Sequence, residues 1–133
     1  MSQNPNISRI ISQKLTKPLD VFTHVSEYNG TIYVSCIQGF LTGTFTLPKN
    51  IEEEAQQMMW NLETILKESH SSLRNIIKLT LFFSNMARDF QVVNSVINNF
   101  SPINPPSRSS IGVSQLPVDC KVVIDCIAAK NSL

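Results

Sequence analysis

One stretch of the chain, "PPSRSSIGVSQLP" (residues 105–117), carries a single charged side chain, Arg108. A guanidinium stays charged and presents a planar fork of donors that matches a carboxylate or a phosphate. The arginine follows three prolines and precedes a run of small and β-branched residues (109–116) that is typical of a strand. These residues predict either an anion-binding arginine at the mouth of a strand or an ordinary surface arginine.

The three cysteines favour neither a disulfide framework nor a metal centre. Their number is odd, and Cys120 and Cys126 fall on one predicted strand, where six residues span roughly 20 Å, beyond disulfide reach. The sequence has no Cys-x-x-Cys and no histidine pair at metal-ligand spacing. We expect reduced cysteines, no metal and no cofactor.

Length and charge limit the classes of function. The 133 residues predict one domain spanning 1–133, with an apolar fraction of 42% that supports a core. The net charge of +1 is unlike that of proteins that neutralise many phosphates, so a nucleic-acid partner is not expected. No apolar run has the length of a membrane span. We expect a cytoplasmic protein, with a mitochondrial location as the alternative because the N-terminus is basic.

A β-hairpin is the clearest local signal. Two β-rich runs flank Asn29-Gly30, the preferred pair for a two-residue type I′ turn. Counting outward from this turn places Val25 opposite Val34 on one face and His24 opposite Ser35 on the other. Residues 42–47 predict a third strand, and an earlier strand is expected around residues 9–12.

The remaining pattern predicts a helix from residue 51, a strand over 76–83, a helix over 87–100 and a last strand over 120–129. Asn50 and Glu53 form a capping arrangement for the first helix. Both faces of the last strand are largely apolar, as in a central strand. The order indicates an α+β domain with two helices on one face of a mixed sheet, whose other face needs a second subunit for cover.

Several segments together resemble one family. "PSRSSIGVSQLPVDCKVVIDCIA" is similar to the C-terminal signature of the RidA/YjgF family, the imine/enamine deaminases also known as endoribonuclease L-PSP proteins. "NIIKLTLFFSNMARDFQVVNSVINNF" resembles the family's central strand and its Asp-Phe-x-x-Val-Asn helix, and "YVS" resembles its Ser-Gly segment. The resemblance extends from about Ile10 to Ala128.

The resemblance implies a chorismate mutase-like fold and a homotrimer in which three sheets form a barrel with clefts between subunits. In such a cleft Arg108 would grip the carboxylate of a 2-imino or 2-enamino acid, which water hydrolyses to a 2-keto acid and ammonia. Ser35 and Asn94 would belong to the same carboxylate-binding half.

The proton-handling half of the site departs from the family pattern. The family's carboxylate on the last strand falls at Val123, and its tyrosine falls at Phe22. Cys36 replaces the glycine after the site serine, and Ser110 replaces a common cysteine. Because valine cannot act as an acid or a base, deaminase activity is the uncertain part of the resemblance.

Two side chains are candidates to replace the lost carboxylate. Asp125 shares a strand face with Val123, about 6–7 Å away along the strand. His24 lies opposite Ser35 on the face of Phe22, and a histidine near neutral pKa can carry a proton. The alternatives are a salt-bridge partner for Asp125 and an ordinary strand position for His24.

Three functions therefore remain open. The first is hydrolysis of 2-imino or 2-enamino acids by a RidA-like homotrimer, and the second is binding of a 2-keto acid or similar small carboxylate without turnover. The third is endoribonuclease or translation-inhibitor activity, which the near-neutral charge and the lack of a basic stripe disfavour.

Overall fold

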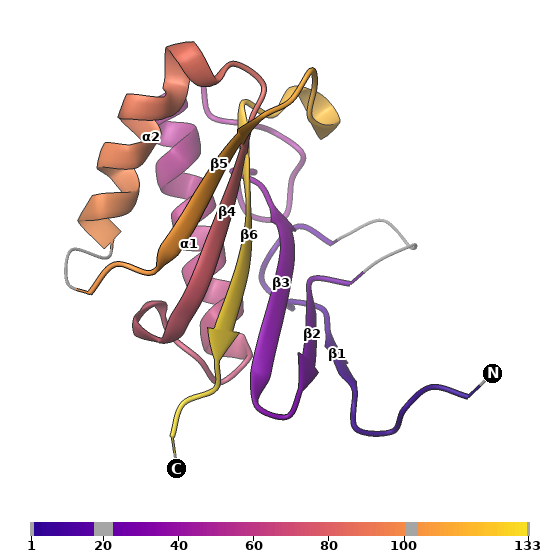
Figure 1. Cartoon of the computed structure of the whole chain (residues 1–133). Helices are drawn as coiled ribbons and strands as arrows, with labels where there is room; N and C mark the ends of the chain where they lie inside the picture. The colour runs from indigo at the N-terminus through magenta and orange to yellow at the C-terminus, as the bar shows by residue number, and fades with distance from the viewer. Residues whose placement is uncertain (1, 18–22, 101–103, 133) are drawn as a thin grey trace.

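A mixed sheet forms one layer of the molecule and two helices form the other (Figure 1). The structure, a computed structural model, describes residues 2–17, 23–100 and 104–132. Its elements are, in chain order, β1 Ser8–Ile10, β2 Val25–Tyr28, β3 Thr31–Ile37, α1 Ile51–Glu68, β4 Ile76–Phe83, α2 Met86–Phe100, β5 Ser107–Gly112 and β6 Val122–Ala129. The strands follow the order β1-β2-β3-β6-β4-β5, in which β4 and β5 pair in parallel and the other pairs are antiparallel. This confirms the α+β fold with both helices on one face of a mixed sheet.

The hairpin that joins β2 to β3 has the predicted register. Asn29 and Gly30 have φ angles of 52° and 79°, the positive values that a type I′ turn requires. Val25 pairs with Val34 across the strands, and both side chains are buried under the helices. Successive side chains of a strand point to opposite faces of the sheet, so Ser26, which follows Val25, points away from the helices.

The start of α1 is fixed by the predicted cap. The side chain of Asn50 accepts a hydrogen bond of 2.9 Å from the Glu53 N–H, which satisfies one of the free donors of the first turn. The apolar stripe of α1 packs into the main core together with the inner face of the sheet. No helix among the described residues is long and apolar enough to cross a bilayer.

The central strand β6 is buried on both faces, as its composition predicts. Val122 and Ile124 lie in the main core under the helices. Val123 points to the other side, where it packs in a smaller cluster with Phe40 and Cys120. Loops at one end of the sheet supply this second layer, so only part of the sheet's second face stays uncovered.

Two details of the predicted strands are wrong. Residues 42–47 form no strand but a tight turn, in which the Leu41 N–H bonds to Thr46 O (2.9 Å) and Gly43 has a φ of 76°. Both edges of β3 are already paired with β2 and β6, so this segment has no free neighbour there. In the predicted strand over 76–83, strict alternation would put Ile77 on the same buried face as Leu79, Leu81 and Phe83. Instead the register shifts between Ile76 and Lys78 and leaves Ile77 50% exposed.

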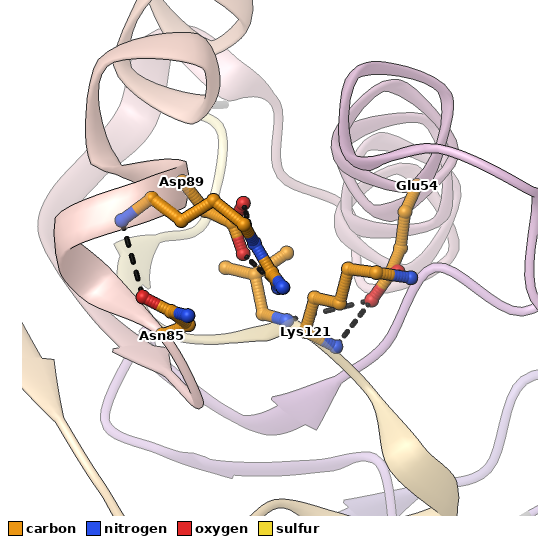
Figure 2. A network of polar contacts seen from close by, with 6 residues as sticks. Glu54, Asn85, Asp89 and Lys121 are labelled. Carbon is orange, nitrogen blue, oxygen red and sulfur yellow. Dashed lines mark hydrogen bonds and ion pairs between the residues drawn. The ribbon is translucent and has the colours of Figure 1, made fainter.

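A buried carboxylate joins α1 to the start of β6 (Figure 2). Glu54 is fully buried, and one oxygen accepts a 2.8 Å hydrogen bond from the Lys121 N–H, while the Lys121 ammonium lies 3.6 Å from the other. Burial raises the pKa of Glu54 above its ordinary value, against the opposing effect of these contacts. The Glu54 contacts fix the chain just before Val123. Asp89 of α2, labelled in the same view, is also buried. It forms a two-point ion pair with Arg88.

Candidate functional site

Arg108 lies on the edge strand β5, inside the strand and not ahead of it as the sequence predicts. Its guanidinium donates a hydrogen bond to Asn94 Oδ1 on α2, so the side chain lies on the helix side of the sheet. Arg108 is exposed, and it forms no ion pair with the residues that the structure describes. Asn94 therefore orients a guanidinium whose remaining donors are available to an anion.

Ser110 lies two residues further along β5, where strand alternation puts it on the same face as Arg108. It is half-buried and pairs with Leu81 of β4 in the parallel ladder. Arg108, Asn94 and Ser110 are thus brought together at one edge of the molecule.

Ser35 and Asp125 lie elsewhere, on the sheet face that the helices do not cover. Both line a cavity of about 210 Å³ between β3, β6 and β4, together with Lys78 and Thr80. An ammonium, a carboxylate and two hydroxyls thus surround one small cavity. Such a set can hold a polar ligand and hold or release a proton at the carboxylate.

Asp125 already has a structural partner. Its Oδ1 accepts a 2.7 Å hydrogen bond from the backbone N–H of Cys36. Cys36 sits at an irregularity of the β3–β6 ladder with a φ of 55°, a left-handed conformation that glycine adopts more easily. The carboxylate therefore stabilises the bulge, and burial, assisted by the nearby Asp125 charge, raises the pKa of the Cys36 thiol.

Val123 occupies an apolar position. It is 3% exposed and lies in the small cluster with Phe40 and Cys120, against which Cys36 and Phe82 pack. An ionised carboxylate at this position would have to lose its hydration among these side chains. Burial also raises the pKa of the Cys120 thiol to about 12, so this cluster contains no group that ionises near neutral pH.

His24 is buried with both ring nitrogens engaged. Nδ1 accepts a 2.9 Å hydrogen bond from the Ser12 N–H, and Nε2 lies 3.1 Å from Thr16 O, to which it donates. The His24 carbonyl accepts from the Ser35 N–H, which confirms that the two residues lie opposite each other. Burial lowers the pKa of His24 despite the raising effects of Thr16 and Glu68. The ring ties the segment after β1 to the sheet.

Phe22 lies outside the described residues. Its neighbours Thr23 and His24 line a second, larger cavity of about 510 Å³ on the uncovered face, which Ser35 and Cys36 share. Two cations that the sequence did not single out, Arg9 and Lys17, line this cavity as well. The pairing of β1 with β2 places Arg9 opposite Ser26 and so brings it near this site, which the hairpin signal in the sequence does not reveal.

The predicted site residues form two groups that one chain does not bring together. Between β3, which carries Ser35, and β5, which carries Arg108, lie β6 and β4. Three strand spacings separate them by roughly 14 Å. Arg108 also lies on the helix side, whereas Ser35 and Asp125 point to the opposite face. A ligand held by both groups has to lie between two copies of the chain.

Comparison with known proteins gives consistent matches over nearly the whole chain. The family model described as "Endoribonuclease L-PSP" matches residues 12–130. The chain is 34% identical to the RutC family protein UK114 of Drosophila melanogaster, over 93% of this chain and 90% of that protein. It is 30% identical to the 2-iminobutanoate/2-iminopropanoate deaminase of Dermatophagoides farinae, over 90% of this chain and 94% of that protein. The crystal structure of yeast Mmf1 superposes with a TM-score of 0.90 at 27% identity, covering 94% of this chain and 99% of that one.

Proposed function

Because the chain belongs to the RidA/YjgF family, described by its model as Endoribonuclease L-PSP, we propose that it binds a small 2-oxo or 2-imino carboxylic acid through Arg108. The observation that carries this proposal is the exposed guanidinium, oriented by Asn94 and without an ion-pair partner among the described residues. A planar carboxylate is the natural partner for the two donors that such an arginine presents side by side.

The binding cleft lies between two copies in a homotrimer. Two features support this: the separation of Arg108 from Ser35, and the uncovered sheet face, on which Tyr33 is 46% exposed. In the trimer, Arg108 of one copy faces Ser35 and Asp125 of its neighbour. The assembly thereby buries the apolar part of the open face and completes the site.

Hydrolysis of a bound 2-imino acid is the chemistry that the polar cavity favours. Water adds to the C=N carbon and the C–N bond then breaks, giving the 2-oxo acid and ammonia. Asp125 is the carboxylate that lines the cavity, so it is our candidate to accept the proton of the attacking water. Lys78, in the same cavity, supplies positive charge. His24 is the second candidate proton carrier, although both its ring nitrogens already bond to the backbone.

The burial of Val123 favours a second function, binding without turnover. With the family's carboxylate position filled by an apolar side chain, the site lacks one positioned proton carrier, a loss that typically reduces rates by about 10²–10⁴-fold. If Asp125 is fully committed to the Cys36 N–H, the cleft acts as a receptor for small acids.

One assay separates these functions. The release of 2-oxo acid from freshly generated 2-imino acids is measured for the parent protein, Arg108→Ala and Asp125→Asn. A hydrolase accelerates release, loses the acceleration in Arg108→Ala and slows by about 10²-fold or more in Asp125→Asn. Asn keeps an acceptor for the Cys36 N–H, so this variant tests the charge and not the bulge. No acceleration, with 2-oxo acids still bound through Arg108, indicates a receptor.

Cleavage of RNA is the function that the charge distribution supports least. The chain has eleven Lys and Arg against ten Asp and Glu, too balanced for strong phosphate binding. We expect RNA affinity to be weak at moderate salt, and strong salt-dependent binding in a filter or mobility assay would contradict this.

A further inference from the structure

The larger cavity is too big for a short acid alone. Its volume of about 510 Å³ falls within the range of about 300–1,000 Å³ that encloses drug-sized ligands. A three- or four-carbon acid whose carboxylate lies near Ser35 and Cys36 leaves most of this space unfilled. The side chain of the ligand therefore has room to extend across the uncovered face.

One part of this cavity is cationic. Arg9 comes from β1, whose register places it opposite Ser26 of β2, and Lys17 comes from the segment after β1. Among the described residues, neither cation forms an ion pair, and no Asp or Glu lines the cavity. Two positive charges thus face a space that contains no countercharge from the described chain.

The rest of the lining is hydroxyl groups and an apolar wall. Thr16, Thr23, Ser26 and Ser35 supply the hydroxyls. Phe40, Phe45, Pro117 and Val118 supply the wall, in which Phe45 and Val118 are each 55% exposed. An apolar ligand segment that covers this wall removes its surface from water.

We propose that the cleft is built for an acid with two anionic groups, such as a 2-oxo or 2-imino dicarboxylic acid. The inference rests on the proposed function: the first carboxylate binds Arg108 of the neighbouring copy beside Ser35. The carbon chain lies along the wall at Phe40, and the second carboxylate reaches Arg9 and Lys17. The two cations thereby determine which side chain the ligand carries.

The exposure of Arg9 and Lys17 determines how strongly they favour an acid with a second carboxylate. Arg9 and Lys17 are both exposed, so their attraction for a carboxylate is partly screened by water. Each such contact changes affinity by up to about fivefold, as for other exposed ion pairs. The two together therefore give a preference of up to about 25-fold, which weakens as salt is added.

The test compares two probe acids on the assembled protein. Calorimetric dissociation constants are measured for 2-oxobutanoate, with one carboxylate, and 2-oxoglutarate, with two. The variants are Arg9→Gln, Lys17→Gln and their combination. Lys14→Gln is the matched control, because Lys14 is an exposed cation of the same segment that does not line the cavity. Lys17→Arg keeps the charge and serves as the rescue variant.

We expect the parent to bind 2-oxoglutarate about tenfold more tightly than 2-oxobutanoate at low salt. The double variant loses this preference with 2-oxobutanoate affinity unchanged, whereas Lys14→Gln and Lys17→Arg retain it. Equal affinity of the parent for the two acids, with both still lost in Arg108→Ala, overturns this inference and leaves the proposed function standing. Failure of the parent to bind either acid overturns both.

Discussion

At the scale of single residues, the site separates binding from proton transfer. Arg108 keeps a guanidinium that is oriented by Asn94 and open to an anion. Position 123, by contrast, carries a valine where the family resemblance implies a carboxylate. Val123 is buried among aromatic and thiol side chains, which leave no room for a hydrated charge. The chemistry that remains depends on Asp125, whose one oxygen already holds the Cys36 bulge.

His24 makes the stability of the fold dependent on pH. Because burial lowers its pKa in the folded state, the unfolded chain binds the proton more readily. The stabilisation that neutral His24 gives the fold is therefore complete above the pKa of this histidine in the unfolded chain, about 6.5. It is lost as the pH falls through the lower pKa of His24 in the folded protein. Protonation also puts a donor on Nδ1, where the Ser12 N–H already donates.

We predict that His24→Gln removes this part of the acid sensitivity, since an amide accepts and donates without titrating. The pH dependence of the free energy of unfolding is measured by urea denaturation at a series of pH values between about 7 and 5. His70→Gln, at the other histidine, is the control and should follow the parent. A His24→Gln variant that loses stability on acidification as steeply as the parent contradicts the role assigned to the ring.

At the scale of elements, the approach of the loop after β3 to α1 depends on a glycine. A Cβ on Gly39 would lie 2.3 Å from Glu54 O and 2.9 Å from Glu54 Cγ. Glu54 is itself fixed by its bonds to the start of β6, so the helix cannot easily move away. This contact sets the path of the chain between Cys36 and Phe40, which line the larger cavity.

We expect Gly39→Ala to lower the free energy of unfolding by about 1–3 kcal/mol, the usual cost of overpacking. Gly112→Ala is the control, because its Cβ would meet only the Met86 side chain at an ordinary 3.5 Å. Equilibrium denaturation of the two variants decides the point. Equal stability of both would mean that the loop rearranges and does not position the cavity.

The elements were largely predictable from the sequence, because their signals are local. Asn29-Gly30 determines the hairpin register, and Asn50 determines where α1 begins. The turn at residues 42–47 was mistaken for a strand because local β-propensity does not show whether a neighbouring strand has a free edge. The buried contact of Glu54 was not predicted, because its partner Lys121 is distant in sequence.

The candidate site was predictable only in part. The family resemblance selected Arg108, Ser35 and Asn94. Only the strand order of the folded sheet shows that Arg108 and Ser35 are far apart within one chain. Arg9 and Lys17 carried no motif, because their place in the cavity arises from the pairing of β1 with β2.

At the scale of the whole molecule, the proposed site requires that copies of the chain assemble. The open sheet face carries Tyr33, which pairs with Ile127 of β6, and one chain does not bring the two halves of the proposed site together. We predict a solution mass of three times 14.9 kDa for the parent. Tyr33→Glu places a charge in the centre of the interface and should give monomers.

Light scattering coupled to size exclusion measures these masses directly. Trp60→Glu is the matched control, since Trp60 is similarly exposed (51%) but lies on α1, away from the open face. It should remain a trimer. A parent protein that runs as a monomer, or a trimeric Tyr33→Glu variant, would show that this face is not the interface.

The role of Arg108 is tested by the affinity of the protein for 2-oxobutanoate with and without this arginine. Calorimetric titration is carried out on the parent, on Arg108→Ala and on Arg74→Ala, an exposed arginine outside the site. We predict saturable binding by the parent and by Arg74→Ala, and a loss of about tenfold or more in Arg108→Ala, as expected for a charged hydrogen-bonding partner. Unchanged affinity in Arg108→Ala would contradict the assignment of this arginine as the carboxylate-binding residue.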